Sequence, residues 1–357
     1  MRLGLLVLIL GLAGCSATPA VPSPAPSSIA PPASPAAPPS APAPVDLRLT
    51  FAGDVHFMDR TAALLKNPAT AFGPIAPTLA DADLTIVNLE TAITSRGEPE
   101  PKTYHFRTTP AAIDALKAAG IDAVSIANNH TLDYGRAGLL DTLDALSAAS
   151  YPAFGAGRNA DQAYAPWITT VRGVRIAVLG FSQVNELASS WAPGPDRPGV
   201  AMAFDTTRAV AAVTAARRQA DLVIVFNHWG DEASSCANSA QKNFAGKLAA
   251  AGADVIVGAH AHTLQGSGWL GSTFVAYGMA NFLWYGTSKS TETGVLRLTV
   301  RGRSVVDTEF LPAVVSDTGQ PKLLTGPAAT RLSQRYASLR TCTDLSPAPS
   351  GSPAQTP

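Results

Sequence analysis

The chain has 357 residues, with 26 basic and 26 acidic side chains and a formal net charge of zero. This balance argues against a sequence-independent nucleic-acid binder, which needs a basic surface to neutralise phosphates. Apolar residues make up 46% of the chain, which argues against a wholly disordered protein. The uncharged apolar run at residues 3–14 is too short to span a bilayer as a helix, so a multi-span transporter is also excluded.

The N-terminal segment predicts export and lipid attachment. Arg2 and the apolar run after it form the charged and hydrophobic regions of a secretory signal over residues 1–14. The run ends in Leu-Ala-Gly-Cys at residues 12–15, which resembles the lipobox of bacterial lipoproteins, where the cysteine is lipidated. An ordinary cleaved signal with an incidental Cys15 is the alternative. The resemblance implies a protein outside the cytoplasm, anchored to the membrane by acyl chains on Cys15.

Residues 15–45 are expected to form a tether. The stretch 16–44 consists mainly of Pro, Ala, Ser, Thr and Val, with 11 prolines among 29 residues. This composition cannot build a packed core and favours extended polyproline II. A Pro- and Ser-rich tail over residues 344–357 is likewise expected to be disordered. The folded part is therefore predicted as one domain over residues 46–343.

Within these limits, short β-branched runs alternate with Ala-rich helical stretches. Continuous apolar runs are typical of strands buried on both faces. The expected strands are 47–53, 84–88, 123–127, 175–180, 222–227, 254–258, 273–277, 294–300 and 304–310. The expected helices are 110–119, 136–149, 206–219 and 239–251. This pattern predicts an α/β domain, and the last strands, which no helix separates, indicate a second, antiparallel-rich sheet.

Polar residues gather just after these strands, where α/β proteins bind their ligands. Five of the six histidines directly follow buried apolar runs, and only His105 falls outside. A single histidine at such a place is more often structural than a ligand. Five of six are hard to explain by packing, because a buried imidazole or carboxylate is costly unless it is paired or bound to a metal. Mixed Asp, His, Asn and Glu ligands suit Mn, Fe or Zn.

The order of these residues resembles the calcineurin-like metallophosphoesterases. That superfamily carries Asp-x-His, a bridging acid, Asn-His with an acid, a lone histidine, and a final His-x-His. The equivalents here are Asp54 with His56, Glu90, Asn129 and His130 with Asp133, His228, and His260 with His262.

More closely, residues 49–312 resemble the CapA family of bacterial capsule or poly-γ-glutamate biosynthesis proteins. Seven ordered blocks carry this resemblance. They are FAGDV (51–55), DLTIVNLE (83–90), IANNHTLDYGRAGLLDTLDAL (126–146), FGAGRN (154–159), VIVFNHWGDE (223–232), GADVIVGAHAHTLQG (252–266) and YGMANFLW (277–284).

The resemblance implies an α/β four-layer sandwich, with two β-sheets flanked by helices, and two divalent metal ions (Mn, Fe or Zn). One ion would be held by Asp54, His56, Glu90 and His262, and the other by Glu90, Asn129, His228 and His260, so that Glu90 bridges them. His130, oriented by Asp133, would protonate the leaving oxygen or stabilise charge. CapA sequences usually carry Met at the position of His56, and the histidine here completes the Asp-x-His motif.

Two further features have open interpretations. Lys102, His105 and Arg107 lie in one loop, which would either meet an anionic substrate or form a solvated surface. Cys236 and Cys342 could form one disulfide in an oxidising compartment, but sequence cannot show how far apart they lie.

Two functional hypotheses follow. The first is a surface lipoprotein that hydrolyses a phosphoester or a related bond in an envelope polymer with two metal ions. The second is a non-catalytic accessory protein that binds or exports capsule polymer. The expected partners are an anionic envelope polymer or a phosphoester substrate, the membrane through the lipid anchor, and capsule-synthesis proteins, with no nucleic acid among them.

Overall fold

A computed structural model describes residue 14 and residues 45–285 and 290–350. The predicted signal peptide apart from residue 14, the lipidation site Cys15, and the tether up to residue 44 lie outside the described residues. Residues 351–357 of the predicted tail also lie outside them. In the part of the chain that is described, no helix is both long and apolar enough to cross a membrane.

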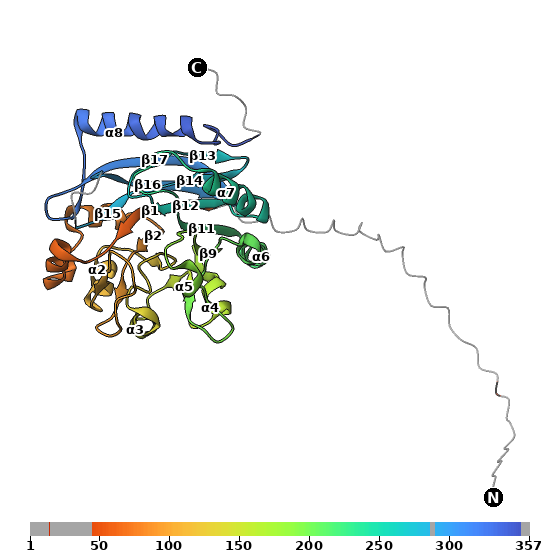
Figure 1. The fold of residues 1–357 in the computed structure, drawn as a ribbon. Helices are drawn as coiled ribbons and strands as arrows, with labels where there is room; N and C mark the ends of the chain where they lie inside the picture. Colours follow the sequence, from red (N-terminus) through yellow and green to blue (C-terminus); the bar gives the residue numbers. More distant parts are fainter. Residues whose placement is uncertain (1–13, 15–44, 286–289, 351–357) are drawn as a thin grey trace, which may run out of the picture. The chain divides into compact units, whose positions relative to one another are not determined.

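Two large sheets form the centre of the domain (Figure 1). The first sheet has the strand order β18-β17-β16-β1-β2-β5-β6, and β15 adds to β1. Its strands are β1 (Asp46–Val55), β2 (Leu84–Leu89), β5 (Ala123–Ser125), β6 (Ala153–Phe154), β15 (Asn281–Leu283), β16 (Glu292–Arg301), β17 (Ser304–Val315) and β18 (Pro321–Leu323). Strands β1, β2, β5 and β6 run parallel, and β16, β17 and β18 are antiparallel to their neighbours.

The second sheet has the order β13-β14-β12-β11-β9-β8. Its strands are β8 (Trp167–Val171), β9 (Val174–Ser182), β11 (Leu222–Trp229), β12 (Val255–His260), β13 (Ser267–Leu270) and β14 (Thr273–Ala276). The four central strands are parallel, and the edge strands β8 and β13 are antiparallel. Two short ribbons pair β3 (Ala92–Ile93) with β4 (Arg107–Thr108), and β7 (Ala156–Gly157) with β10 (Gly199–Val200).

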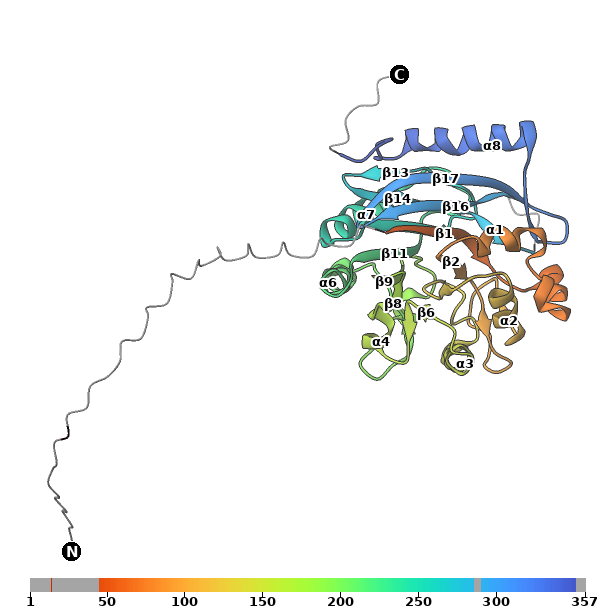
Figure 2. The same ribbon diagram turned by 180° about the vertical axis from the view of Figure 1, so that it is seen from behind.

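Helices cover the outer faces of both sheets, as the two opposite views in Figures 1 and 2 show. The α-helices are α1 (Ala76–Ala80), α2 (Ala111–Ala118), α3 (Gly135–Ala148), α4 (Ala160–Tyr164), α5 (Ala188–Trp191), α6 (Thr206–Arg217), α7 (Ser239–Ala251) and α8 (Gly326–Ser338). The 3₁₀ turns are η1 (Asp59–Lys66), η2 (Pro68–Thr70), η3 (Gly73–Ile75) and η4 (Leu339–Cys342).

Strand β11 shows why the layers stack in this order. Its residues Leu222, Ile224 and Phe226 point into the core between the two sheets, where they meet side chains of β1 and β2. The alternate residues Val223 and Val225 point to the other face and pack with α6 and α7. Because successive side chains of a strand point to opposite faces, a continuous apolar run can serve two cores at once.

A third core lies between the first sheet and helices α2 and α3. The layers are therefore helices, first sheet, second sheet and helices. This arrangement confirms the predicted α/β fold of two sheets flanked by helices.

Most expected elements are present, and two expectations are corrected. The late antiparallel strands β16 and β17 do not make a separate sheet, because β16 pairs with β1, β17 pairs with β16, and both extend the first sheet. The tail does not begin at residue 344. The Tyr277 hydroxyl donates to Asp344, Ser346 exchanges two backbone hydrogen bonds with Trp269, and the Ser350 N–H donates to the Gly271 carbonyl. The end of the described chain is thus held against β13 and β14.

Helix α8 lies outside the elements expected from the sequence. It packs on β17, where the Tyr336 ring stacks on Phe310 at 3.9 Å between centroids. Leu332 and Tyr336, one helical turn apart, are its buried residues. A proline in the first turn and this spacing are the local signals of the helix.

Candidate metal centre

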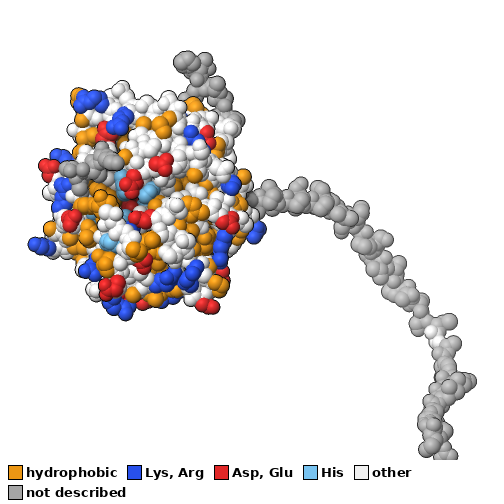
Figure 3. Space-filling view, in the orientation of Figure 1, with side chains coloured by type: hydrophobic (Ala, Val, Ile, Leu, Met, Phe, Trp, Pro, Cys, Tyr) orange, Lys and Arg blue, Asp and Glu red, His pale blue; other side chains and the backbone are white. Residues whose placement is uncertain are grey.

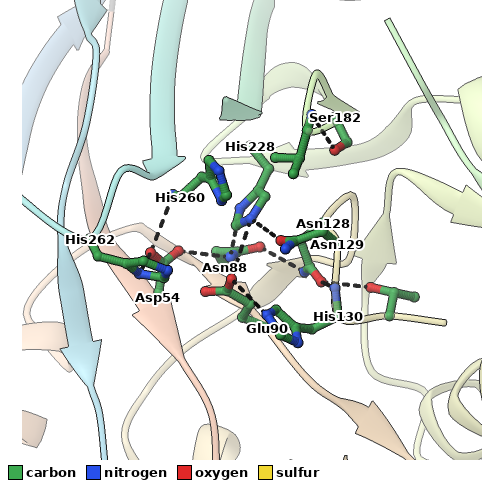
Figure 4. A network of polar contacts seen from close by, with 12 residues as sticks. Asp54, Asn88, Glu90, Asn128, Asn129, His130, Ser182, His228, His260 and His262 are labelled. Carbon is green, nitrogen blue, oxygen red and sulfur yellow. Dashed lines mark hydrogen bonds and ion pairs between the residues drawn. The ribbon is translucent and has the colours of Figure 1, made fainter. Parts of the chain in front are cut away.

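The ends of the parallel strands from both sheets converge on one buried polar cluster (Figure 4). It takes Asp54 from β1, Asn88 from β2 with Glu90 just after it, Asn129 and His130 from the segment after β5, His228 from β11, and His260 and His262 from the end of β12. The carboxyl ends of parallel strands meet at one edge of a sheet, and two such edges face each other here. Figure 3 shows histidine and acidic atoms appearing together on this face of the domain.

Two glycines allow the strands to approach closely enough to build the cluster. A Cβ atom on Gly53, next to Asp54, would lie 1.8 Å from the carbonyl oxygen of Ala280. A Cβ on Gly258, two residues before His260, would lie 2.0 Å from the carbonyl oxygen of Tyr277. Only glycine fits at either place.

Glu90 occupies the centre of the cluster. Its side chain is fully buried, and neither carboxylate oxygen has a hydrogen-bond partner among the described residues. Oε1 lies 3.3 Å from His228 Nε2 and 3.9 Å from His130 Nε2. Burial, and then the neighbouring Asp54 carboxylate, raise the pKa of Glu90 well above its ordinary value. A buried carboxylate without donors is costly unless it is paired or binds a metal, which makes Glu90 a candidate metal ligand.

Two groups of ligand atoms share Glu90. One group is Glu90 with His260 and His262, and the other is Glu90 with Asp54 and His228; within each, the ligand atoms lie within 4.8 Å of one another. Glu90 belongs to both groups. His262 Nδ1 also lies 3.5 Å from Asp54 Oδ2, and His228 Nε2 lies 2.8 Å from Asn129 Oδ1, so the division of the remaining ligands between two ions stays a prediction.

The histidine side chains are in the form that binds metals. Burial lowers the pKa of His228 to about 3 and that of His260 well below its usual value, so both rings are neutral at pH 7. The Nδ1 atom of His260 is buried and has no partner among the described residues. The two Glu90 oxygens and this nitrogen are therefore buried atoms of metal-binding type that have no hydrogen-bond partner in the described chain.

His262 differs from the other histidines. Burial alone would lower its pKa, but the hydrogen bond to Asp54 and the negative charge of Glu90 raise it to about 9. Its Nδ1 lies 2.7 Å from Asn281 Oδ1 and 3.5 Å from Asp54 Oδ2. Without a metal, a proton on His262 balances the charge of Asp54.

His56 is not brought into either ligand group. The backbone N–H of Met58 donates to its Nδ1 at 3.1 Å, and the backbone N–H of Tyr285 lies 3.4 Å from its Nε2. Phe106, Trp284 and Tyr285 surround the ring, with centroids 4.2–4.7 Å away. Backbone donors face both ring nitrogens, and the ring packs as part of an aromatic cluster, so the role of His56 as a metal ligand stays a prediction without support from this arrangement.

Asn88 and Asn129 orient His228. The Asn88 amide donates to Asp54 Oδ1 at 2.8 Å and lies 3.2 Å from His228 Nδ1. On the other side, His228 Nε2 lies 2.8 Å from Asn129 Oδ1. The Asn129 oxygen and the His228 nitrogen thus point toward each other, and the His228 nitrogen lies 3.3 Å from Glu90 Oε1.

His130 and Asp133 form a hydrogen-bonded pair at the edge of the cluster. His130 Nδ1 lies 2.6 Å from Asp133 Oδ2, and the ring stacks on Phe106 at 3.9 Å. Burial lowers the pKa of His130 and raises that of Asp133 to about 6. The neutral imidazole then carries its proton on Nδ1, toward Asp133, and turns a free Nε2 toward Glu90. Asn128 braces this segment, because its oxygen accepts from the backbone N–H of His130 at 3.0 Å.

Lys102, His105 and Arg107 lie in one loop but have different surroundings. Lys102 has a side chain only 1% exposed and pairs with Asp133 and Glu186, so a solvated surface is wrong for this residue. His105 Nε2 contacts the carbonyl of Glu100, and the exposed Arg107 stacks over Tyr134. Glu186, in the segment between β9 and α5, carries no sequence signal that sets it apart from other acidic residues.

A disulfide joins Cys236 to Cys342, with 5.5 Å between the Cα atoms. It ties η4 to the loop that follows β11. In the same loop, the Ala233 N–H donates to the carbonyl of Ala261 at 2.7 Å, between His260 and His262. The pairing left open by the sequence is present, and it supports the segment that carries two ligand histidines.

Comparison with known proteins identifies the family. Residues 48–285 match the family model described as bacterial capsule synthesis protein PGA_cap. This match covers more than half of the chain. The chain belongs to the bacterial capsule synthesis protein family.

Two relatives within the capsule synthesis family illustrate the similarity. The PGA biosynthesis protein CapA of Bacillus subtilis is 30% identical over 243 residues, which are 66% of this chain and 63% of that protein. The capsule biosynthesis protein CapA of Bacillus anthracis is 27% identical over 291 residues, which are 78% of this chain and 70% of that protein. The match thus spans somewhat less than two thirds of the first relative.

The solved structures similar to this chain share little sequence identity with it. A phosphatase from Mycoplasma pneumoniae is 15% identical, with a TM-score of 0.47, over 81% of this chain and 97% of that one. The NAD nucleotidase of Haemophilus influenzae is 15% identical, with a TM-score of 0.44, over 86% of this chain and 58% of that one.

Proposed function

We propose that this chain is a metal-dependent hydrolase of the phosphoester type that acts in capsule, poly-γ-glutamate or other envelope-polymer biosynthesis. The observation that carries the proposal is the buried Glu90 carboxylate, whose two oxygens have no hydrogen-bond donor among the described residues and which two groups of ligand atoms share. A single ion would satisfy one such group, and the presence of two groups favours a pair of divalent ions, with Mn, Fe and Zn as candidates.

The residues that would hold the pair are Asp54, Glu90, Asn129, His228, His260 and His262. When bound, two divalent ions would polarise a phosphoryl group and make a water molecule acidic enough to attack at neutral pH. Glu90 fits between them because both of its oxygens are free to accept, and His260 Nδ1 fits because nothing else in the described chain bonds to it.

His130 is the proposed proton carrier. Its Nε2 faces the cluster, while Nδ1 is held by Asp133. A proton taken up at Nε2 makes the ring cationic, and the Asp133 carboxylate stabilises that charge and keeps the ring in one orientation. His130 then passes the proton to the oxygen of the leaving group. The stacked Phe106 ring excludes water from one face of the imidazole.

The setting proposed for this activity is the cell surface. The lipobox-like sequence ending in Cys15 would anchor the domain to the membrane, and residues 15–45 would hold it away from the bilayer. The printed names of the Bacillus relatives support an envelope polymer as the substrate or partner. Capsule-synthesis proteins are the proposed protein partners.

A non-catalytic accessory role is the alternative. It is favoured by a relative in Mycobacterium tuberculosis, described as a probable polyglutamine synthesis accessory protein, which is 33% identical over 209 residues. In that case the same cluster would bind polymer or metal without turnover.

Metal analysis of the full chain in detergent, after loading with Mn, Fe or Zn, separates these possibilities. We expect two equivalents of metal and turnover of phosphomonoester or phosphodiester substrates that Glu90→Gln abolishes. Less than about half an equivalent would contradict the metal centre. Two equivalents without turnover of any envelope or phosphoester substrate would favour the accessory role.

The anchor has its own test. Cys15→Ser should move the exported chain from the membrane fraction to the soluble fraction, as followed by immunoblotting. Retention of the variant in the membrane fraction would contradict lipidation at Cys15.

A further inference from the structure

Lys102 lies in a buried hub beside the metal centre. Its ammonium group is 2.8 Å from Asp133 Oδ1 and 2.8 Å from Glu186 Oε2, and it also donates to the backbone carbonyl of Asn129. The Trp191 ring lies 5.1 Å from the same nitrogen. With a side chain only 1% exposed, Lys102 has no solvent to replace these partners. One cation thus connects the segment that carries Asn129 with the residue that orients His130.

Glu186 determines which atom of the Asn129 amide faces the metal centre. The Asn129 Nδ2 group donates to Glu186 Oε2 at 3.1 Å, which leaves Oδ1 directed at His228 Nε2, 2.8 Å away. An amide binds a metal ion only through its oxygen. If the amide were flipped, its oxygen would face the carboxylate of Glu186 and its NH₂ group would face the ligands. Glu186 therefore selects the productive orientation by accepting the amide protons.

The charge of Glu186 requires Lys102 in turn. Glu186 and Asp133 are both acidic, and both contact the same ammonium group. Without Lys102 the two carboxylates would share this site with no cation between them. The lysine permits two carboxylates to act on the two functional side chains, Asp133 on His130 and Glu186 on Asn129.

We propose that Lys102 and Glu186 are positioning residues of the metal centre, with Glu186 orienting the ligand amide of Asn129 and Lys102 holding Glu186 and Asp133 in place. This inference rests on the proposed function, because it takes Asn129 as a metal ligand. It predicts that Glu186 affects metal affinity although it lies outside both ligand groups.

The test is calorimetric titration of the metal-free full chain with Mn²⁺. Loss of a partner that orients a metal ligand typically weakens affinity about 10- to 100-fold, and we expect a loss of this size at one of the two Mn²⁺ sites in Glu186→Ala. Glu186→Gln should restore most of the affinity, because its amide oxygen can still accept from Asn129. Glu98→Ala, which removes an exposed glutamate, is the control and should bind as the wild type does.

A double mutant distinguishes orientation from general support of the fold. In Asn129→Asp, the ligand has two equivalent oxygens and needs no orienting partner, and Glu186 then repels it. Adding Glu186→Ala to Asn129→Asp should therefore leave Mn²⁺ affinity unchanged or raise it. A loss of 10-fold or more in this background would overturn the inference, since a structural role of Glu186 would weaken both backgrounds alike.

Mn²⁺ binding by the wild-type chain shows whether a negative result counts against the positioning role alone or against the proposed metal centre as well. If the wild-type chain binds no Mn²⁺, the proposed metal centre fails, and the positioning role fails with it. If the wild type binds two Mn²⁺ ions and Glu186→Ala binds them equally tightly, the metal centre stands and the positioning role is overturned.

Discussion

The ligand cluster around Glu90 and the hub around Lys102 lie side by side. In the hub, Lys102 and Asp133 are buried and the Glu186 side chain is 37% exposed, and the two regions differ in how their charges are satisfied. In the hub, Lys102 meets Asp133 and Glu186 at 2.8 Å, so acids and base compensate each other within the protein. In the cluster, Glu90 has no donor and His260 Nδ1 has no partner in the described chain. A folded protein tolerates such atoms when an external ligand completes them, so the unpaired region is the proposed binding site and the paired region its proposed support.

The largest expected effect comes from Glu90→Gln. We expect loss of metal binding and of hydrolytic activity, because the shared ligand of both groups is gone. Without metal, the buried Glu90 carboxyl has a pKa well above its ordinary value and must take up a proton on folding, a cost that the neutral amide avoids, so the free energy of unfolding at pH 7 should rise by about 1–2 kcal/mol. Thermal unfolding in the presence of a chelator measures this. If the variant is instead less stable than the metal-free wild type, the Glu90 carboxyl group makes stabilising contacts within the protein, as Asp133 and Glu186 do with Lys102.

Lys102→Met should have the opposite effect on stability. It leaves Asp133 and Glu186 without their cation, and removal of one partner of a buried ion pair costs about 3–5 kcal/mol. Denaturant unfolding of the metal-free chain measures the loss. Lys117→Met removes an exposed lysine of α2 and should change the free energy of unfolding by less than about 0.5 kcal/mol. If both substitutions change the free energy of unfolding equally, the ion pairs of Lys102 contribute no more to stability than an exposed lysine does.

Replacing both Cys236 and Cys342 with serine tests whether the disulfide stabilises the loop that contacts the segment of His260 and His262. The disulfide closes a loop with a sequence separation of 106, and we expect a loss of about 2–4 kcal/mol on chemical unfolding. Metal affinity should fall as well, because the same loop donates from Ala233 to Ala261. Unchanged stability in the double variant would mean that the disulfide contributes little to this part of the fold.

The smallest expected effect is that of His56→Met. The structure places His56 in an aromatic cluster outside both ligand groups, so metal stoichiometry should stay at the wild-type value and affinity should change by less than about threefold. His260→Ala is the matched ligand variant and should lose one metal ion. Metal analysis of the two proteins side by side gives the result. A lost equivalent in His56→Met would restore this residue to the ligand set.

Much of the fold could be predicted because its strands are short, apolar and ended by clear signals. Gly120 and Gly252 have left-handed backbones directly after α2 and α7, as expected of glycines that end helices. The edge strand β8 and helix α8 were not predicted, and both are only partly buried, so they lack the continuous apolar runs of the central strands. The pairing of β16 with β1 joins residues more than 200 positions apart, and no local pattern encodes that choice.

The site divides in the same way. Sequence alone determined that Asp54, Glu90, Asn129, His228, His260 and His262 follow buried strands, and the edges of parallel strands bring such residues together. Tertiary structure decided which of them face one another. It turned His56 toward backbone donors, placed His262 beside Asp54, and buried Lys102 between two acids. Those outcomes depend on contacts between segments far apart in the chain, where neither residue type nor spacing specifies the partner.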